Sequence, residues 1–234
     1  MKRTLTMLLA FMLLVPALAP VLAVDGASIV QNVTEVRNAS TAASITTVGG
    51  SFTTLVLNVT SQTLRWKAYV GNVTGKITLD DSTNKTIYDW TPAQIAGEIY
   101  ATRASSIDWT KISCADQTII ESEQSYLNMN DSSDRINRTF NLTIHRTFFV
   151  GITQIMNSSC PAIATYINDT AQAPSEDANF QEVLLNSTTN LIYTGILEPG
   201  TPGFDLNAYN FQLILPEDGT KSTPTPYYFY VELT

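Results

Sequence analysis

The stretch LRWKAYVGNVTGKITL, residues 64–79, decides the predicted fold. Apolar side chains occupy every second position on both sides of Gly71-Asn72, and polar side chains fill most positions between them. The apolar positions of this alternation are Leu64, Trp66, Ala68, Val70, Val73, Ile77 and Leu79. Because successive side chains of a strand point to opposite faces, the pattern predicts a β-hairpin with one buried face. We expect Asn72 at its exposed tip.

Strand signals continue beyond this hairpin. Residues 80–84 predict a second turn, and residues 85–90 predict a third strand. The longest alternation spans residues 136–148, with Asn137, Asn141 and His145 on its polar face. Further strands are expected at residues 53–60, 148–156, 191–197, 207–215 and 227–233. The last two flank the turn signature Pro-Glu-Asp-Gly at 216–219 and are expected to pair.

Helix signals are few. Short helices are expected from the Thr-Pro-Ala-Gln capping box at 91–94, at residues 117–128 and at residues 176–185. Many short strands separated by turn signals predict an all-β fold, an antiparallel β-sandwich or jelly roll with a few short helices.

The N-terminal 23 residues have the layout of a secretory signal peptide. Lys2 and Arg3 precede an apolar run, and small side chains lead to an expected cut after Ala23. The alternative is a retained helix, either a membrane anchor or a pilin-like stem, which Pro16 and Pro20 would interrupt. No other segment approaches the ~20 apolar residues of a membrane span. Residues 24–234 are therefore expected to form one extracellular domain.

The charge balance excludes one class of partner. After removal of the signal peptide, 11 Lys and Arg face 21 Asp and Glu. Binding to nucleic acid depends on basic side chains that displace counterions, so a nucleic-acid partner is not expected.

Asparagine placement points to a glycoprotein. Eleven of the 16 asparagines begin an Asn-x-Ser/Thr triplet, whereas the 50 Ser and Thr residues among 234 would give about 3 or 4 by chance. The predicted glycosylation sites are Asn32, Asn38, Asn58, Asn72, Asn84, Asn130, Asn137, Asn141, Asn157, Asn168 and Asn186. The excess predicts a heavily glycosylated protein of the cell exterior.

Cys114 and Cys160 are the only cysteines, and in an exported chain they are expected to form a disulfide. A metal site is the alternative, but the chain has no Cys-x-x-Cys and no neighbouring histidine. No cofactor or metal is expected.

Catalytic chemistry has few candidates. His145 is the single histidine and is expected to be a solvated residue of a polar strand face, which disfavours a histidine-dependent triad or a zinc site. Glu98 is the one acid in an apolar setting. The other acids, at 80–81, 121–123 and 176–177, fall in predicted turns and helix starts.

Two further groups allow a binding function. Oxygen-bearing side chains at 128–134 suit calcium, although a polar loop is the plainer interpretation because the EF-hand spacing is missing. These side chains are Asn128, Asn130, Asp131 and Asp134. Trp66, Trp90 and Trp109 could stack on sugars, but core packing is the expectation, since Trp66 is in phase with the apolar positions of its strand.

The segments WKAYVGNVTGKITLDDSTNKTIYDW (66–90), GEIYATR (97–103) and IDW (107–109) resemble a motif of archaeal exported β-rich surface proteins. The overall layout of signal peptide, dense triplets and strands also resembles the subunits of glycosylated archaeal threads and bundling pili. In those filaments the N-terminal segment of one subunit completes the sheet of the next. The resemblance implies such a role for residues 24–36 and brings no catalytic residues with it.

These observations favour a non-enzymatic, glycosylated structural subunit of a cell-surface filament or envelope layer, which binds copies of itself. The alternative is a secreted carbohydrate-binding module or glycoside hydrolase on a β-sandwich, and a third hypothesis is a solute-binding or adhesive envelope domain. The last two require a sugar-binding face or a ligand pocket.

Overall fold

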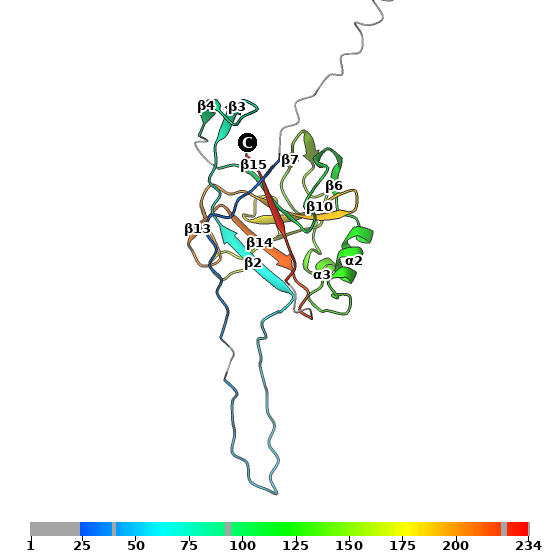
Figure 1. Ribbon diagram of the computed structural model, residues 1–234. Helices are drawn as coiled ribbons and strands as arrows, with labels where there is room; N and C mark the ends of the chain where they lie inside the picture. The colour runs from blue at the N-terminus through cyan, green and yellow to red at the C-terminus, as the bar shows by residue number, and fades with distance from the viewer. Residues whose placement is uncertain (1–23, 39–40, 92–94, 221–223, 234) are drawn as a thin grey trace, which may run out of the picture.

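The structure is a computed structural model that describes residues 24–38, 41–91, 95–220 and 224–233. The predicted signal peptide and most of the predicted capping box at 91–94 lie outside the described residues. Short antiparallel strands dominate, and the helices are short, which confirms the predicted all-β class (Figure 1).

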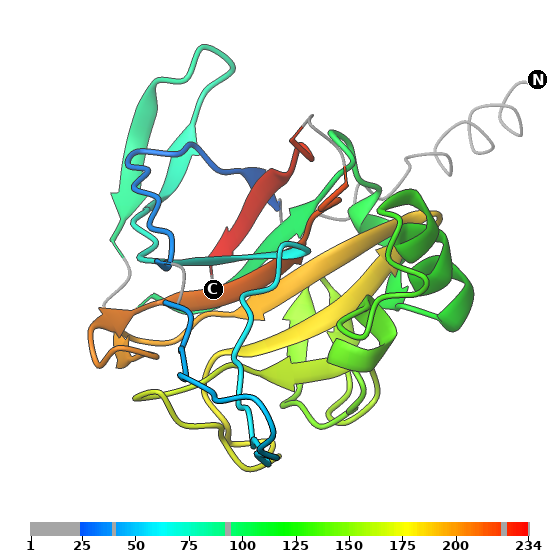
Figure 2. The same cartoon turned by 90° about the horizontal axis from the view of Figure 1, so that it is seen from below.

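A central antiparallel sheet organises the molecule. Its order is β1 (Asp25–Gly26), β15 (Tyr228–Leu233), β5 (Gly97–Thr102), β11 (Asn190–Ile196) and β10 (Gln181–Ser187). The far edge of β10 pairs with both β9 (Ala162–Ala164) and β6 (Ile112–Cys114), at different positions along the strand. Figure 2 shows β10 and β11 side by side in yellow and orange, at the centre of the body.

Both faces of this sheet are covered, so the body has three layers. One face packs against β7 (Phe148–Val150), β8 (Thr153–Ile155) and the 3-10 helix η1 (Trp109–Lys111). The other packs against the ribbon of β2 (Trp66–Gly71) and β14 (Phe211–Pro216), and against helices α2 (Gln117–Tyr126) and α3 (Ile136–Thr139). A small pair, β12 (Thr201–Pro202) with β13 (Ala208–Tyr209), lies beside the ribbon. As a consequence, all seven residues of β10 are buried.

The predicted hairpin across Gly71-Asn72 is wrong. β2 pairs with β14, far along the chain, and β3 (Ile77–Asp80) pairs with β4 (Thr86–Trp90). The link after β2 is held by Asn210, whose Oδ1 accepts the Val73 N–H and whose own N–H donates to Asn72 Oδ1. A non-local partner therefore replaces the local turn. The second turn and third strand are confirmed as the β3–β4 hairpin, and Asn72 is exposed as expected.

The strand predicted at 136–148 is also wrong. Residues 136–139 form α3, and residues 140–147 contribute only an isolated bridge between Leu142 and Ala162. Ile136 and Phe140 are both buried in the same core cluster. Residues four apart share a face in a helix as well as in a strand, so the alternation could not distinguish the two here.

The helix predicted at 176–185 is wrong as well. Ser175 does begin a turn, in which its Oγ accepts the Asp177 N–H and its carbonyl accepts the Ala178 N–H. Phe180 then adopts a positive φ of 51°, which ends the turn, and β10 begins at Gln181. The helix at 117–128 is confirmed as α2, with Asp116 as its N-cap accepting the Ile119 N–H.

Predictions for the other strands are mixed. Strands at 191–197, 207–215 and 227–233 are confirmed as β11, β13 with β14, and β15. The last two do not pair with each other, because β14 joins β2 while β15 joins β5 and β1. Residues 148–156 form the β7–β8 hairpin instead of one strand. Residues 53–60 are exposed and form no strand.

Candidate functional site

The predicted glycosylation sites lie mostly on the surface. Nine of the eleven triplet asparagines are exposed, and Asn137, in the first turn of α3, is half-buried. Asn186 lies within β10, is 7% exposed, and accepts a hydrogen bond from Ser113 Oγ at 2.7 Å. Ten of the eleven predicted glycosylation sites are therefore at least partly accessible to solvent, and Asn186 is buried.

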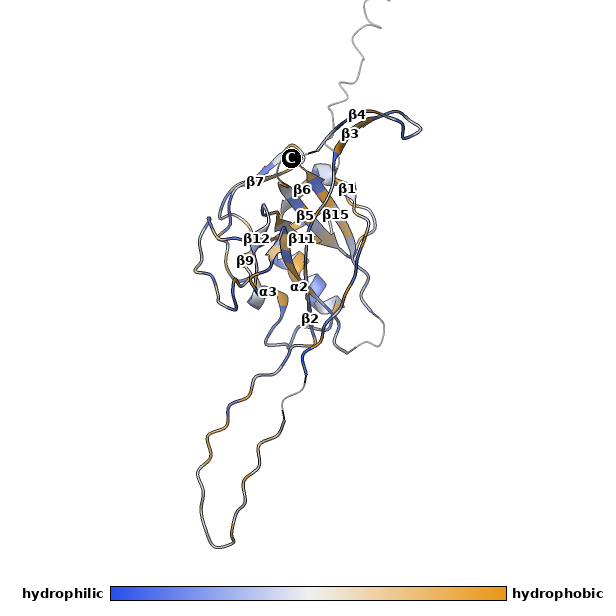
Figure 3. Cartoon of the chain, turned by 90° about the vertical axis from the view of Figure 1, so that its left-hand side faces the viewer, coloured by the Kyte–Doolittle hydropathy of each residue, from blue (hydrophilic) through white to orange (hydrophobic). Residues whose placement is uncertain are grey.

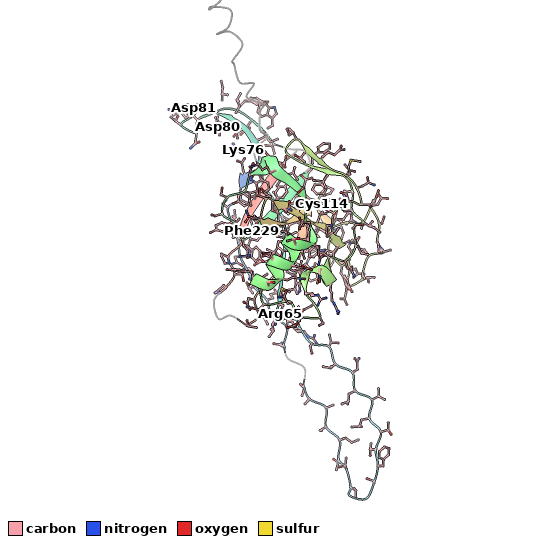
Figure 4. The ribbon with its side chains drawn as sticks, turned by 90° about the vertical axis from the view of Figure 1, so that its right-hand side faces the viewer. Arg65, Lys76, Asp80, Asp81, Cys114 and Phe229 are labelled. Carbon is pink, nitrogen blue, oxygen red and sulfur yellow. A yellow bond between two sulfur atoms is a disulfide. The ribbon has the colours of Figure 1, made fainter. Side chains whose placement is uncertain are left out.

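The predicted disulfide is present. Cys114 of β6 is bonded to Cys160, which precedes β9, with their Cα atoms 4.9 Å apart. Because β6 and β9 share the same edge of β10, the bond fastens two strands whose register is already set by that edge. Figure 4 shows Cys114 within the body.

His145 is fully buried, which corrects its expected place on a solvated face. Its Nε2 accepts the N–H groups of Ser159 and Cys160, at 3.2 and 3.0 Å. Its Nδ1 therefore carries the proton and donates to the Arg146 carbonyl at 2.8 Å. Burial lowers the pKa of the imidazole. The ring is a structural acceptor that holds the chain beside the disulfide, and the alternation that placed it in solvent belonged to a strand that does not form.

Two buried glutamates face each other across neighbouring strands. Glu98 of β5 is the register partner of Glu232 of β15, and both are almost fully buried. Glu232 accepts hydrogen bonds from Tyr100 Oη and from the Gly151 N–H, each at 2.9 Å, whereas Glu98 Oε2 has no partner among the described residues. Burial, and secondarily the nearby Glu232, raise the pKa of Glu98 to about 8.

Neither Glu98 nor Glu232 lines either of two cavities among the described residues. The two cavities described in the structure measure about 290 and 130 Å³ and are lined by other residues, one beside β1 and β15 and one near Leu142 and Pro174. A glycosidase needs two carboxyls that reach a sugar from a cleft. What the pair can do chemically is hold a proton inside the sheet at neutral pH.

The other acids form hydrogen bonds or ion pairs. Asp81 accepts the N–H groups of Thr83 and Lys85 in the β3–β4 turn, which agrees with the expectation that acids of turns serve local structure. Glu123 differs from the expectation, because it lies inside α2 and forms a bidentate ion pair with Arg103, 20 residues away along the chain, at 2.6 Å for both contacts.

The oxygen-rich loop at 128–134 forms hydrogen bonds within itself and to neighbouring segments of the chain. Asn128 Nδ2 donates to Asp218, and the Asp134 carboxylate accepts from Ser132 Oγ and from Thr63 Oγ1. Within the described ranges, no three His, Cys, Asp or Glu side chains gather closely enough to hold a metal ion. The geometry is that of a polar loop.

The three tryptophans lie apart. Trp66 packs against Phe140 and donates its Nε1–H to the Asp134 carbonyl at 2.6 Å. Trp109 packs among the aromatic rings of the central sheet and is half-buried. Trp90 is 49% exposed and lies edge-on to Tyr88, with ring centroids 4.8 Å apart. Core packing thus describes Trp66 and Trp109, and Trp90 is a surface residue.

The largest uncovered apolar feature is an extended arm, residues 41–64. Every residue of the arm is exposed, and none is charged. Its large apolar side chains are Ile45, Val48, Phe52, Leu55, Val56, Leu57, Val59 and Leu64. The two limbs meet at Gly49-Gly50 and project away from the body, and Figure 3 shows apolar positions recurring along them in orange.

A second uncovered apolar feature is one face of the β3–β4 hairpin. The register pairs Ile77 with Trp90 and Leu79 with Tyr88, which places all four side chains on one face. They are between 44% and 60% exposed. The alternation in residues 64–79 predicts a buried face for Ile77 and Leu79, and this prediction is wrong because both side chains are exposed. The hairpin and the arm lie at opposite ends of the molecule (Figures 1 and 3).

The N-terminal segment 24–36 joins the sheet only at its start. β1 pairs Asp25 with Val231 and Gly26 with Tyr230, and the Ala27 N–H donates to the Phe229 carbonyl at 2.9 Å. Residues 28–36 are exposed and belong to no strand. Within one molecule, residues 25–27 therefore occupy part of the outer edge of β15.

Comparisons with known proteins identify no relative: no family, no curated protein and no solved structure matches the chain. In the part of the chain that the structure describes, no helix combines the length and apolar character needed to cross a membrane.

Proposed function

We propose that the chain is a non-enzymatic, N-glycosylated structural subunit of the cell surface that polymerises into a filament or an envelope layer. The observation that carries the proposal is the arm, an exposed segment of 24 residues with eight large apolar side chains and no charge. Exposed apolar surface of this extent marks an interaction site in a protein that remains in solution.

The energetics favour burial of the arm against protein. Full burial of a Leu, Val or Phe side chain contributes roughly 1.5–3 kcal/mol, and association costs about 4–15 kcal/mol. Four or five arm side chains are enough to offset much of that cost. Because the arm carries no charge, its docking removes no ion from water.

The placement of Asn58 supports a defined docking face. Side chains of an extended segment alternate, so Asn58 points opposite to Leu55, Leu57 and Val59, all of which are exposed. A glycan on Asn58 therefore leaves the Leu55/Leu57/Val59 face free. Asn58 is the only predicted glycosylation site within the arm, and the other ten lie on the body, in the β3–β4 turn and at positions 32 and 38.

The test is electron microscopy of the secreted protein, combined with one arm variant. Leu57→Glu places a charge on the proposed docking face, and Thr54→Glu places the same charge on the opposite face. Both positions are exposed in the monomer, so neither change disturbs the folded body. We expect ordered polymers for the parent chain and for Thr54→Glu, and dispersed monomers for Leu57→Glu. Dispersed monomers of the parent chain at all concentrations would contradict the proposal.

One observation favours a second candidate, a carbohydrate-binding module. Tyr88 and Trp90 are exposed neighbours, and aromatic faces bind the apolar faces of sugar rings. Titration of the chain with polysaccharides, followed by tryptophan fluorescence, tests it. Saturable quenching that is lost in Trp90→Ala supports the candidate, and an unchanged spectrum eliminates it.

A further inference from the structure

The arm and the β3–β4 hairpin are two uncovered apolar features at opposite ends of one chain. In Figure 4, Arg65 marks the base of the arm at one end, and Asp80 and Asp81 mark the hairpin at the other. Each molecule carries one of each. Two different patches that bind one another join copies head to tail and produce an open chain when the rotation does not close.

One face of the β3–β4 hairpin is apolar and exposed to solvent. Ile77, Leu79, Tyr88 and Trp90 are exposed on the same side. The opposite side is polar apart from Ile87, and it carries the Lys76–Asp89 ion pair at 2.6 Å. An isolated two-stranded hairpin is marginally stable in water, and packing of its apolar face against further structure stabilises it.

The base of the arm fixes its direction. Thr63 Oγ1 donates to Asp134 Oδ2 at 2.5 Å, and Arg65 Nη1 donates to the Asn128 carbonyl at 2.8 Å. The Arg65 carbonyl accepts the Glu217 N–H at 2.7 Å, beside the ribbon of β2 and β14. These contacts hold the limb where it leaves the body, at the end away from the hairpin.

The Leu55/Leu57/Val59 face of the arm cannot cover the hairpin of its own molecule. An extended chain rises about 3.3 Å per residue, so Leu57 lies within about 26 Å of Arg65. A compact body of this size measures roughly 40 Å across. The hairpin on the far side is therefore out of reach of this face, and a contact between the two requires a second molecule.

We propose that the Leu55/Leu57/Val59 face of the arm packs on the Ile77/Leu79/Tyr88/Trp90 face of the next copy, so that the polymer grows head to tail. This inference rests on the proposed function and specifies its interface. Both faces are uncharged, and both are apolar at alternate positions, as two packed β-layers require. Asn58 points away from the contact, and Asn84 lies in the β3–β4 turn, beyond the paired residues.

Cross-linking between copies tests the pairing. The two native cysteines are joined to each other, so an introduced thiol is the only free one. Secreted Leu57→Cys protein is mixed with Tyr88→Cys protein under mild oxidation. We expect a mixed dimer at least tenfold more abundant than either homodimer. A chain with both substitutions should give a ladder of covalent oligomers on a non-reducing gel.

A third cysteine variant separates the competing interfaces. Ala68 is exposed on β2, whose outer edge could accept an added strand. Cross-linking of Leu57→Cys to Ala68→Cys but not to Tyr88→Cys would overturn the head-to-tail pairing, as would a dominant Leu57→Cys homodimer. If polymers form on microscope grids and no 57–88 bond is found, this inference fails while the proposed function stands. If the parent chain forms no polymer, the proposed function itself fails.

A matched pair of hairpin variants supplies an independent measurement. Tyr88→Ser alters the proposed docking face, and Ile87→Ser alters the opposite face at a position that is also exposed. We expect at least a tenfold loss of polymer, measured by sedimentation, for Tyr88→Ser and no loss for Ile87→Ser. Equal effects of the two changes, or loss of sugar binding alone in Tyr88→Ser, would overturn the inference.

Discussion

Replacement of Glu98 by glutamine should make the protein more stable at pH 8 and leave its stability near pH 4 unchanged. The Glu98 carboxyl is 5% exposed, faces Glu232 across the β5–β15 pair, and lies beside Tyr100. Its pKa rises from 4.5 to about 8 on folding, chiefly because burial disfavours the charged form. Glutamine has nearly the same shape and no charge.

The sign follows from proton binding. Between pH 4.5 and about 8 the folded protein keeps the Glu98 proton while the unfolded chain releases it. The folded state binds more protons in this window, so the free energy of unfolding falls as pH rises. Each pKa unit corresponds to ~1.4 kcal/mol, and the whole shift therefore corresponds to roughly 5 kcal/mol. Above about pH 8 the contribution of Glu98 to the free energy of unfolding no longer changes with pH.

Urea unfolding followed by circular dichroism, at pH values from 4 to 9, measures the effect. The parent protein should lose stability steadily across this range, with further losses from the buried Glu182 and Glu198, whose pKa values burial also raises. The Glu98→Gln variant should show a shallower decline and exceed the parent by several kcal/mol at pH 8. Parallel pH curves for the two proteins would refute the reasoning.

Three further predictions concern single contacts. Arg103→Met should lower the free energy of unfolding, measured with urea, by about 3–5 kcal/mol because it leaves the buried Glu123 carboxylate without its cation. The double variant Arg103→Met, Glu123→Leu should recover most of this stability, and an equal loss in the single and double variants would contradict the prediction. Gly97→Ala should lower the free energy of unfolding by about 3 kcal/mol or more, because φ at Gly97 is 117° and an added Cβ would lie 2.0 Å from the Glu232 carbonyl oxygen. An unchanged melting temperature would exclude this close approach. Peptide mass spectrometry of the secreted protein should find Asn186 unmodified and the exposed triplets glycosylated, and a glycan on Asn186 would show that β10 is not buried as described.

Local patterns predicted elements well where the chain needs no distant partner to define them. The α2 helix follows from Asp116 as N-cap, and β11 and β15 follow from runs of β-branched and aromatic residues. The disulfide followed from the presence of two cysteines in a chain with a predicted signal peptide. The pairing of the strands could not be predicted from local patterns, because β2 pairs with β14 and β5 pairs with β15, each more than a hundred residues away along the chain.

The surface features were the hardest to predict. The alternation in residues 53–60 and 64–79 indicates an apolar face. It does not indicate whether that face packs against the same molecule or against another one. The structure leaves Leu57 and Ile77 uncovered, and the same alternation that suggested core packing now marks candidate interfaces. The buried glutamate pair gave no signal beyond the apolar setting of Glu98, because its partner Glu232 is contributed by a strand near the other end of the chain.

The bond between Cys114 and Cys160 has a consequence for the response of the chain to proteolysis. It encloses α2, α3 and the β7–β8 hairpin, which include several exposed turns. A single cut anywhere between the two cysteines opens the chain but leaves both pieces covalently joined, and each piece still contributes strands that pair along β10. A nicked chain therefore remains one molecule, and a polymer of the kind proposed above would keep its length after damage that would sever an unbridged chain.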